Sequence, residues 1–207
     1  MRLGLLGGTF NPPHIAHLVC AQEAWAHLGL DRVLLLPVAT PSHKQSEADP
    51  GPQERLELCR LAVGDDERLG VSALEVEREG ASYTVDTLRA LHDRSPQDEL
   101  TFIVGGDMAL SLPTWREPEA VLGLATLGVA ERSGASRQDI SDRLAVLGAA
   151  DRVAFFDMPR LDVSSSALRA RVADGRPVRY LVPGAVAERI EARGLYRPHE
   201  QVGNTSA

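Results

Sequence analysis

Two histidines, His14 and His17, lie three residues apart, directly behind a stretch rich in glycine and proline. On a helix this spacing places both imidazoles on one face, at the positive end of the helix dipole. Residues 3–6 form a short apolar run typical of a buried parallel strand, and residues 15–28 carry apolar side chains at helical spacing. The sequence therefore predicts a strand-to-helix turn whose imidazoles and free backbone amides bind an anion, and phosphate is the expected anion.

Glycines and prolines shape this turn. Gly7 and Gly8 are expected to allow positive φ values and a close approach of the backbone to a ligand. Pro12 and Pro13 fix the chain direction and carry no N–H group that needs a partner. In open α/β sheets such turns, at the carboxyl ends of the strands, are where ligands bind.

A second group of hydroxyl and guanidinium side chains lies near the C-terminus. Ser164, Ser165 and Ser166 are consecutive, and Ser164 is predicted to cap a helix. The free N–H groups of this helix start form a second place for an anion. Arg169 follows one turn later, where its guanidinium can bind two phosphate oxygens.

Polar residues also follow the predicted strand at residues 100–104. Asp107 comes just after it and suits either a ribose hydroxyl or a helix cap, two alternatives that local chemistry leaves open. The segment 39–52 is predicted as a long loop that carries His43 and Lys44. Lys44 is the only lysine among 22 basic residues, which favours a role over a solvated loop.

Three further segments allow a structural and a functional interpretation. Ser82 or Thr84 can cap a helix through its hydroxyl. Trp115 is by default a core residue, and Trp25 is assigned to packing of the first helix. Arg132 either faces a phosphate or is simply exposed.

These motifs, in this order, resemble the nicotinate-nucleotide adenylyltransferases of the nucleotidyltransferase superfamily. The resemblance extends from residue 1 to about residue 197. The chain departs from the family pattern at Ala16, where the family has Gly, at Ser133, where it has Pro, and at Ser166 and Leu168, where it has Thr and Ile. The motifs that carry the resemblance are G-G-T-F-N-P-P-H-I-A-H at 7–17, P-S-H-K at 41–44, G-A-S-Y-T-V-D-T-L at 80–88, G-G-D at 105–107, P-T-W at 113–115 and V-S-S-S-A-L-R at 163–169.

The resemblance implies transfer of the adenylyl group of ATP to nicotinate mononucleotide, giving nicotinate-adenine dinucleotide and pyrophosphate. No residue is placed as a covalent nucleophile, so the expected reaction is direct in-line attack, with Mg²⁺ held by the substrate phosphates and no metal ligands in the protein. The residues implied as catalytic are His14, His17, Lys44 and Arg169. Those implied in ATP binding are Gly7, Gly8, Thr9, Phe10, His14, His17, Gly105, Asp107, Ser164, Ser165 and Arg169. Those implied in binding the mononucleotide are Asn11, His43, Lys44, Ser82, Tyr83, Thr84, Trp115, Arg116 and Arg132.

The expected fold is α/β, a Rossmann-like doubly wound parallel sheet with a small C-terminal helical part. One nucleotidyltransferase domain spans residues 1–197, and residues 198–207 are expected to form a disordered tail. Further strands are predicted at 33–36, 71–76, 124–129 and 152–156, and further helices at 53–63, 136–147 and 183–193.

Composition narrows the functional classes. A net charge of −7 argues against a general nucleic-acid binder, and no apolar run is long enough to cross a membrane. Cys20 and Cys59 lie in apolar helical segments without metal-ligand spacing, which predicts buried thiols. No signal peptide is expected, so we expect a cytoplasmic protein. A homo-oligomer remains open.

Three alternatives to this function remain. A sister adenylyltransferase would use phosphopantetheine as the acceptor, and another would prefer the nicotinamide mononucleotide. A non-catalytic regulator would bind ATP on the same fold and release no pyrophosphate.

Overall fold

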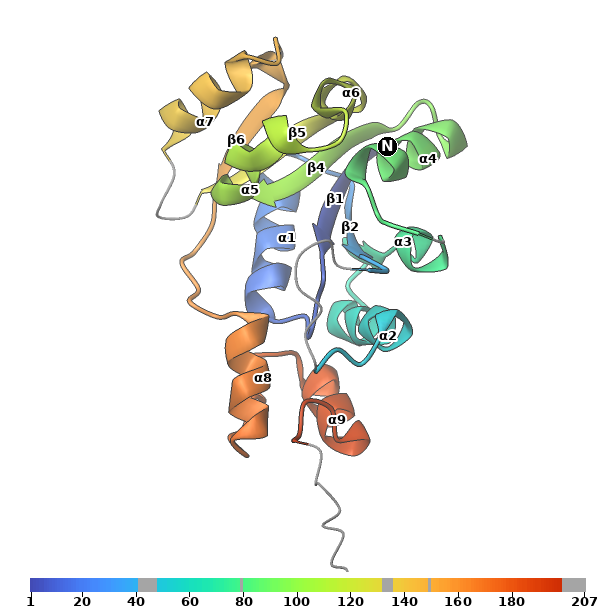
Figure 1. The fold of residues 1–207 in the computed structure, drawn as a ribbon, viewed down its shortest axis with the longest axis vertical. Coiled ribbons are helices and arrows are strands. Elements are labelled where there is room, and N and C mark those ends of the chain that lie inside the picture. Colours follow the sequence, from blue (N-terminus) through green and yellow to red (C-terminus); the bar gives the residue numbers. More distant parts are fainter. Residues whose placement is uncertain (41–47, 79, 132–135, 149, 199–207) are drawn as a thin grey trace, which may run out of the picture.

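The computed structural model describes residues 1–40, 48–78, 80–131, 136–148 and 150–198. Within these ranges parallel strands form a sheet in the order β3-β2-β1-β4-β5-β6 (Figure 1). The strands are β1 (Arg2–Gly8), β2 (Arg32–Pro37), β3 (Leu69–Val71), β4 (Glu99–Gly105), β5 (Ala125–Glu131) and β6 (Val153–Asp157). The strands are built from apolar runs because both faces of this sheet are covered by helices.

The strand order creates one particular crevice. The chain runs outward from β1 to β3 on one side, then crosses back so that β4 pairs with β1 on the other. In such a sheet, ligands bind outside the carboxyl ends of the strands where the order reverses. Here that point lies between β1 and β4, whose following residues are Thr9 and Gly106. The predicted doubly wound fold is confirmed.

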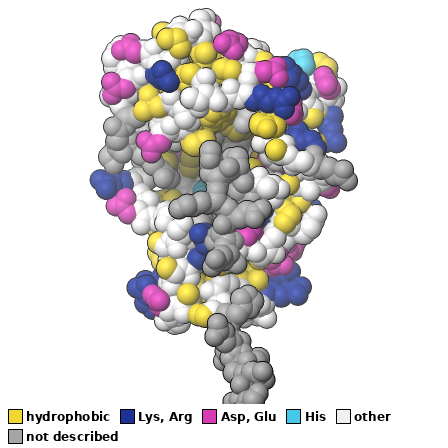
Figure 2. All heavy atoms as spheres, in the orientation of Figure 1, with side chains coloured by type: hydrophobic (Ala, Val, Ile, Leu, Met, Phe, Trp, Pro, Cys, Tyr) yellow, Lys and Arg dark blue, Asp and Glu magenta, His cyan; other side chains and the backbone are white. Residues whose placement is uncertain are grey.

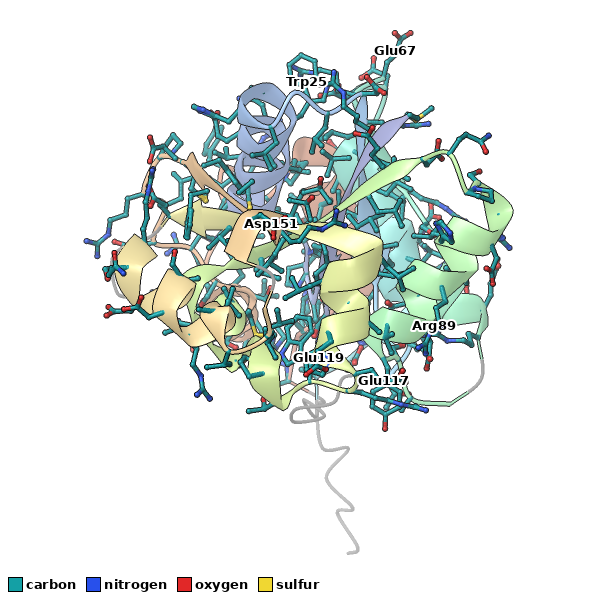
Figure 3. All side chains as sticks on the ribbon, turned by 90° about the horizontal axis from the view of Figure 1, so that it is seen from above. Trp25, Glu67, Arg89, Glu117, Glu119 and Asp151 are labelled. Carbon is teal, nitrogen blue, oxygen red and sulfur yellow. The ribbon has the colours of Figure 1, made fainter. Side chains whose placement is uncertain are left out.

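Helices cover both faces of the sheet. On one face lie α1 (Ile15–His27) and α2 (Pro52–Val63), which pack Cys20, Ala24 and Cys59 against the strands. On the other lie α4 (Thr84–Arg94), α5 (Gly106–Ser111), α6 (Pro118–Leu124) and α7 (Arg137–Ala145). Figure 3 shows this division, with Trp25 on α1 on one side of the sheet and Glu119 on α6 on the other. Both cysteines are buried thiols, as predicted.

The C-terminal helices form a third, smaller core against α2. Helix α9 (Gly184–Arg193) lies beside α2, and α8 (Ser165–Ala173) lies beyond the start of α1, both away from most of the sheet (Figure 1). Gly194 ends α9 in the left-handed conformation, with φ 62°, as a residue after a helix often does. The residues of this core are Leu58, Ala62, Leu168, Val178, Val182, Val186, Ile190 and Tyr196. They confirm the predicted C-terminal helical part.

One predicted strand is wrong. The segment 71–76 does not continue as a strand, because β3 ends at Val71 and α3 (Leu74–Glu77) follows. The N–H of Leu74 donates to the Ser72 hydroxyl, which turns the chain, and Glu75 of α3 is buried. An apolar-rich stretch of this length fits a strand or a single helical turn equally well, so periodicity could not decide.

The short helical elements were not predicted. These are α3, α5, α6 and the 3₁₀ turns η1 (Leu112–Thr114) and η2 (Ala150–Arg152). Each is too short to show a helical period in the sequence. Of the predicted tail, residues 199–207 lie outside the described residues. No described helix is both long enough and apolar enough to span a membrane.

Candidate active site

The turn after β1 is shaped by aromatic rings. Neither Gly7 nor Gly8 has a positive φ, so that prediction is wrong; the residue in the left-handed region is Phe10, with φ 50°. A Cβ on Gly8 would lie 3.1 Å from the Phe10 ring, and one on Gly7 would lie 3.1 Å from the ring of Phe102. Here the glycines make room for two rings, and the strain of the turn falls on Phe10.

His14 and His17 form a stacked pair at the start of α1. His14 is the N-cap, one residue before the helix, and His17 is in its first turn. Their ring centroids are 3.7 Å apart with the planes inclined by 20°, and the edge of Phe10 packs against His17. The backbone N–H of His14 donates to Nδ1 of His17 at 3.2 Å. A neutral His17 therefore carries its hydrogen on Nε2, where it can donate to an anion.

The backbone amides at this helix start are less available than the sequence predicted. The N–H of Ile15 donates to the carbonyl of Leu181 at 3.1 Å, and that of His17 donates to the carbonyl of His14 at 2.9 Å. The prediction of free backbone amides is therefore wrong at Ile15 and His17. The predicted anion would therefore meet the imidazoles rather than these two amides.

Residues far apart in the sequence meet at this turn. Arg169 of α8 donates from Nη1 to the carbonyl of Asn11 at 2.7 Å, and the Ser165 hydroxyl donates to the carbonyl of Pro12 at 2.8 Å. The Asn11 side chain is only 3% exposed, and its Oδ1 accepts no hydrogen bond from a described residue. The structure thus brings the first and last predicted motifs together, and leaves an acceptor on Asn11.

The hydroxyls at the start of α8 already have protein partners. Ser164 is the N-cap, as predicted, and its Oγ accepts from the N–H of Ala167 at 3.2 Å. The Ser166 hydroxyl accepts from Nη2 of Arg169 at 3.2 Å. The Ser166 bond helps to fix the arginine beside the turn. Both hydroxyls act as acceptors in these bonds, which do not use their O–H donors.

Asp107 lies at the carboxyl end of β4, next to the turn. Strands β1 and β4 pair in register from Arg2 with Glu99 to Leu6 with Ile103, so their ends are adjacent. Gly105 is the N-cap of α5, and the exposed Asp107 is in its first turn without capping it. The helix-cap alternative is therefore wrong for Asp107, and its role toward a ribose stays a prediction.

The predicted acceptor end lies at the start of α4. Tyr83 is its N-cap and makes no side-chain capping bond, so the prediction that Ser82 or Thr84 caps the helix is wrong. Arg116 lies over the Tyr83 ring, 4.7 Å from the centroid, with Nη1 3.7 Å from Asp86. On the same surface Arg89 of α4 pairs with Glu117, and both are labelled in Figure 3.

Phe102 connects the two ends of the site. Its ring meets the edge of the half-buried Trp115 with centroids 5.9 Å apart, and the same ring lies beneath Gly7. The indole N–H of Trp115 donates to the Ser111 hydroxyl at 3.0 Å, which fixes the ring. Trp25 packs against the core on α1, as predicted.

Some predicted site residues lie outside the described ones, namely His43, Lys44 and Arg132. Ala16 is fully buried in α1. Figure 2 shows the molecular surface hollowed between the sheet layer and the C-terminal helices, with a histidine side chain visible in the hollow. Among the described residues no group of three or more His, Cys, Asp or Glu side chains is placed to hold a metal ion.

Sequence reasoning missed Arg55, the largest of the fully buried side chains among the described residues. It donates to the carbonyl of Thr9 in the turn and to those of Val38 and Ala39 after β2. The available signal was an arginine among the apolar positions of the predicted helix 53–63. Phe102 lies inside the predicted strand 100–104, and its sequence position carries no signal of a role in the site.

Comparison with known proteins fits this geometry. Residues 5–171 match the family model described as cytidylyltransferase-like, which places the chain among the nucleotidyltransferases. A probable nicotinate-nucleotide adenylyltransferase of Exiguobacterium sibiricum is 46% identical, covering 95% of this chain and 99% of its own length. One of Desulfitobacterium hafniense is 41% identical, covering 95% and 96%. The chain belongs to the nicotinate-nucleotide adenylyltransferase family.

Solved structures share the fold at lower identity. A Plasmodium falciparum nicotinic acid mononucleotide adenylyltransferase complexed with NaAD superposes with a TM-score of 0.78 at 15% identity, covering 94% of this chain and 97% of that one. A putative nicotinate-nucleotide adenylyltransferase of Vibrio parahaemolyticus gives 0.68 at 20% identity, covering 95% and 96%. The architecture is therefore common to distant relatives.

Proposed function

We propose that this chain joins ATP and nicotinate mononucleotide to give nicotinate-adenine dinucleotide and pyrophosphate, a step of NAD synthesis. The observation that carries the proposal is the stacked pair His14 and His17, set beside Arg169 on one turn at the reversal point of the sheet. Membership of the family supports the choice of substrates.

The chemistry needs no covalent intermediate. The phosphate of the mononucleotide carries nearly two negative charges at neutral pH, because its second pKa is about 6. One of its oxygens attacks the α-phosphorus of ATP, and the bond from that phosphorus to the bridging oxygen of the pyrophosphate breaks. The obstacles are repulsion between two anions and the charge that develops on the leaving pyrophosphate. Positioned donors and cations overcome both.

The donors of the phosphate end have distinct tasks. His17 donates from Nε2 to the triphosphate, in an orientation that its Nδ1 bond to the His14 backbone maintains. His14 supports the stacked ring and faces the same anion. Arg169 binds the β- and γ-phosphates by exchanging its bond to the Asn11 carbonyl for phosphate oxygens.

The remaining residues bind the rest of the substrates. Asp107 accepts from the ribose of ATP beside Gly105, and the turn from Gly7 to Phe10 receives the nucleotide. At the acceptor end the nicotinate carboxylate lies at the start of α4, where Thr84 is the first helical residue, and the pyridine ring stacks on Trp115. The other residues that we propose to bind the mononucleotide are Ser82, Tyr83, Arg116 and Asn11, together with His43, Lys44 and Arg132 of the undescribed segments.

Mg²⁺ enters this proposal as part of the substrate, where it would offset the negative charge of the ATP phosphates. Both cysteines are buried thiols, as in proteins of a reducing compartment, and we propose that the protein acts in the cytoplasm.

The test is pyrophosphate release with ATP and Mg²⁺, comparing nicotinate mononucleotide, nicotinamide mononucleotide and phosphopantetheine as acceptors. We expect turnover to be strongly favoured with the first. Preference for either of the others would contradict the proposed acceptor and keep the adenylyl transfer. Binding of ATP without pyrophosphate release for any acceptor would contradict the enzyme and favour a nucleotide-binding regulator.

A further inference from the structure

Arg55 of α2 is a charged side chain with no exposed surface. A buried guanidinium is unfavourable unless its donors find partners. Nε donates to Asp49 Oδ1 at 3.0 Å, and Nη1 donates to the carbonyls of Thr9 at 3.0 Å and Val38 at 2.7 Å. Nη2 donates to the carbonyl of Ala39 at 2.9 Å. The group is thus bound mainly to backbone rather than to a carboxylate.

These carbonyls lie where two neighbouring strands have ended. Thr9 follows β1, and Val38 and Ala39 follow β2, so a parallel ladder no longer supplies their partners. The N–H of Val38 donates to the carbonyl of Gly8 at 3.1 Å and continues the connection for one more residue. The guanidinium of Arg55 then joins the two segments beyond the sheet.

The turn that Arg55 holds is strained. Thr9 is followed by Phe10, whose φ of 50° is uncommon for a residue with a large side chain. Phe10 is followed by Asn11, whose carbonyl binds Arg169. Two guanidinium groups therefore hold the residues on either side of Phe10, Arg55 at Thr9 and Arg169 at Asn11. Such backbone conformations persist only where the surroundings fix them.

We propose that Arg55 is a positioning residue of the ATP site: it fixes Thr9, and through Phe10 it sets the place of His17. The Phe10 ring provides the mechanical link, because its edge packs against His17 with centroids 4.9 Å apart. When Arg169 exchanges the Asn11 carbonyl for phosphate, Arg55 is the guanidinium that remains on the turn. This inference rests on the proposed function where it is tested by turnover. Where it is tested by ATP binding, it does not depend on that function.

Lysine cannot replace Arg55 in this role. The acceptors lie around a planar fork, and an ammonium group is a single point with fewer donors. A second ion pair on the same helix gives a matched control. Glu54, the neighbour of Arg55, accepts two hydrogen bonds from Arg189 of α9 at 2.7 and 3.0 Å, and this pair involves no residue of the turn.

The experiment measures ATP binding by calorimetry and steady-state kinetics in Arg55→Lys and Glu54→Gln, with urea unfolding of both. We expect Arg55→Lys to lower kcat/KM for ATP by about 100-fold, the effect of a displacement of roughly 1 Å at a site, and to weaken ATP binding. The KM for the mononucleotide should change much less. Glu54→Gln should lose stability and keep its ATP parameters.

A folded Arg55→Lys variant with the parent's ATP affinity and kcat/KM would overturn the proposal and leave Arg55 with a role in stability alone. If Arg55→Lys does not fold, Asp49→Ala provides the second test, because it removes the carboxylate that orients Nε and leaves the guanidinium in place; the same carboxylate also accepts from the N–H of Gly51 at 2.9 Å, so urea unfolding is measured for this variant too. We expect Asp49→Ala to weaken ATP binding, and unchanged binding would equally overturn the proposal. If the parent releases no pyrophosphate, the proposed function fails, and the calorimetry still decides the role of Arg55.

Discussion

The two ends of the proposed site are built in different ways. At the phosphate end the partners are buried or half-buried, and the bonds that join Arg169 and Ser165 to the turn span more than 150 residues of sequence. At the acceptor end the contacts are exposed: Tyr83 is 42% exposed, and Arg116 lies over its ring.

The difference has a physical consequence. The His14 and His17 pair is fixed before the substrate arrives, and donors of that kind need no reorganisation in the transition state, which makes them effective in catalysis. Exposed ion pairs such as Arg116 with Asp86 are screened by salt and contribute little to stability. We therefore expect the phosphate end to govern turnover and the acceptor end to govern affinity for the mononucleotide.

The largest expected effect is at the phosphate end. His17→Ala removes the Nε2 donor and should lower kcat by about 100- to 1000-fold without loss of folding, because a positioned donor acts mainly on the transition state. Steady-state kinetics with circular dichroism measures both. His27→Ala, on the exposed last turn of the same helix, is the control and should keep its activity. Near-normal turnover in a folded His17→Ala variant would remove the histidine pair from the mechanism.

At the acceptor end the effect should fall on KM. Trp115→Ala removes the proposed stacking partner of the pyridine ring and should raise the KM for nicotinate mononucleotide by roughly 10-fold, since stacking on an aromatic ring contributes about 1–3 kcal/mol. The KM for ATP should change little. Trp25→Ala is the matched control. Trp25 packs against the core on one face of the sheet, whereas Trp115 packs against the core on the other face, where α6 lies (Figure 3). An equal rise in both KM values would contradict the division between the two ends.

A smaller effect concerns stability and pH behind the acceptor end. Burial raises the pKa of Glu75 above its ordinary 4.5. This effect outweighs the hydrogen bond from the Thr87 hydroxyl and the charge of Arg78, which both lower the pKa. A raised pKa in the folded state gives stability that is complete in acid and is lost as the pH rises through that pKa. Glu75→Gln cannot ionise, so we expect its stability relative to the parent to increase as the pH rises from about 4.

The stability of Glu54→Gln relative to the parent should change with pH in the opposite direction. The hydrogen bonds from Arg189 lower the pKa of Glu54, so its contribution is present at neutral pH and is lost as the pH falls through the lowered value. Urea unfolding at pH 4 and pH 7.5 measures both variants. If the stabilities of Glu75→Gln and Glu54→Gln, each relative to the parent, changed with pH in the same direction, this would contradict a raised pKa at Glu75 together with a lowered pKa at Glu54.

The smallest expected effect is at the base of the phosphate end. The Tyr196 side chain is buried, no described residue hydrogen-bonds its hydroxyl, and burial raises the pKa of this phenol. Tyr196→Phe removes a buried hydroxyl without a partner and should raise the free energy of unfolding by about 1 kcal/mol. Chemical denaturation measures this. A loss of stability would show that the hydroxyl has a partner that matters.

Much of the fold followed from local sequence. Apolar runs alternating with helical periods predicted the parallel sheet, and capping signals placed the starts of α8 and α9 within a residue. The strand predicted at 71–76 is wrong, because a turn made by Ser72 and a buried Glu75 produce no periodic pattern in the sequence. The histidine pair and Arg169 were predicted from their spacing at helix starts and from the motifs that resemble the family, and the structure brings them to one turn.

What the sequence by itself determined was the set of chemical groups and the order of the elements that carry them. Only the tertiary structure decided how these groups are held: Arg55 on Thr9, Phe102 between Gly7 and Trp115, and the positive φ at Phe10 instead of at the glycines. The physical reason is that these arrangements depend on contacts between segments distant in the chain. A strained turn or a buried guanidinium is stable only once those segments have packed around it.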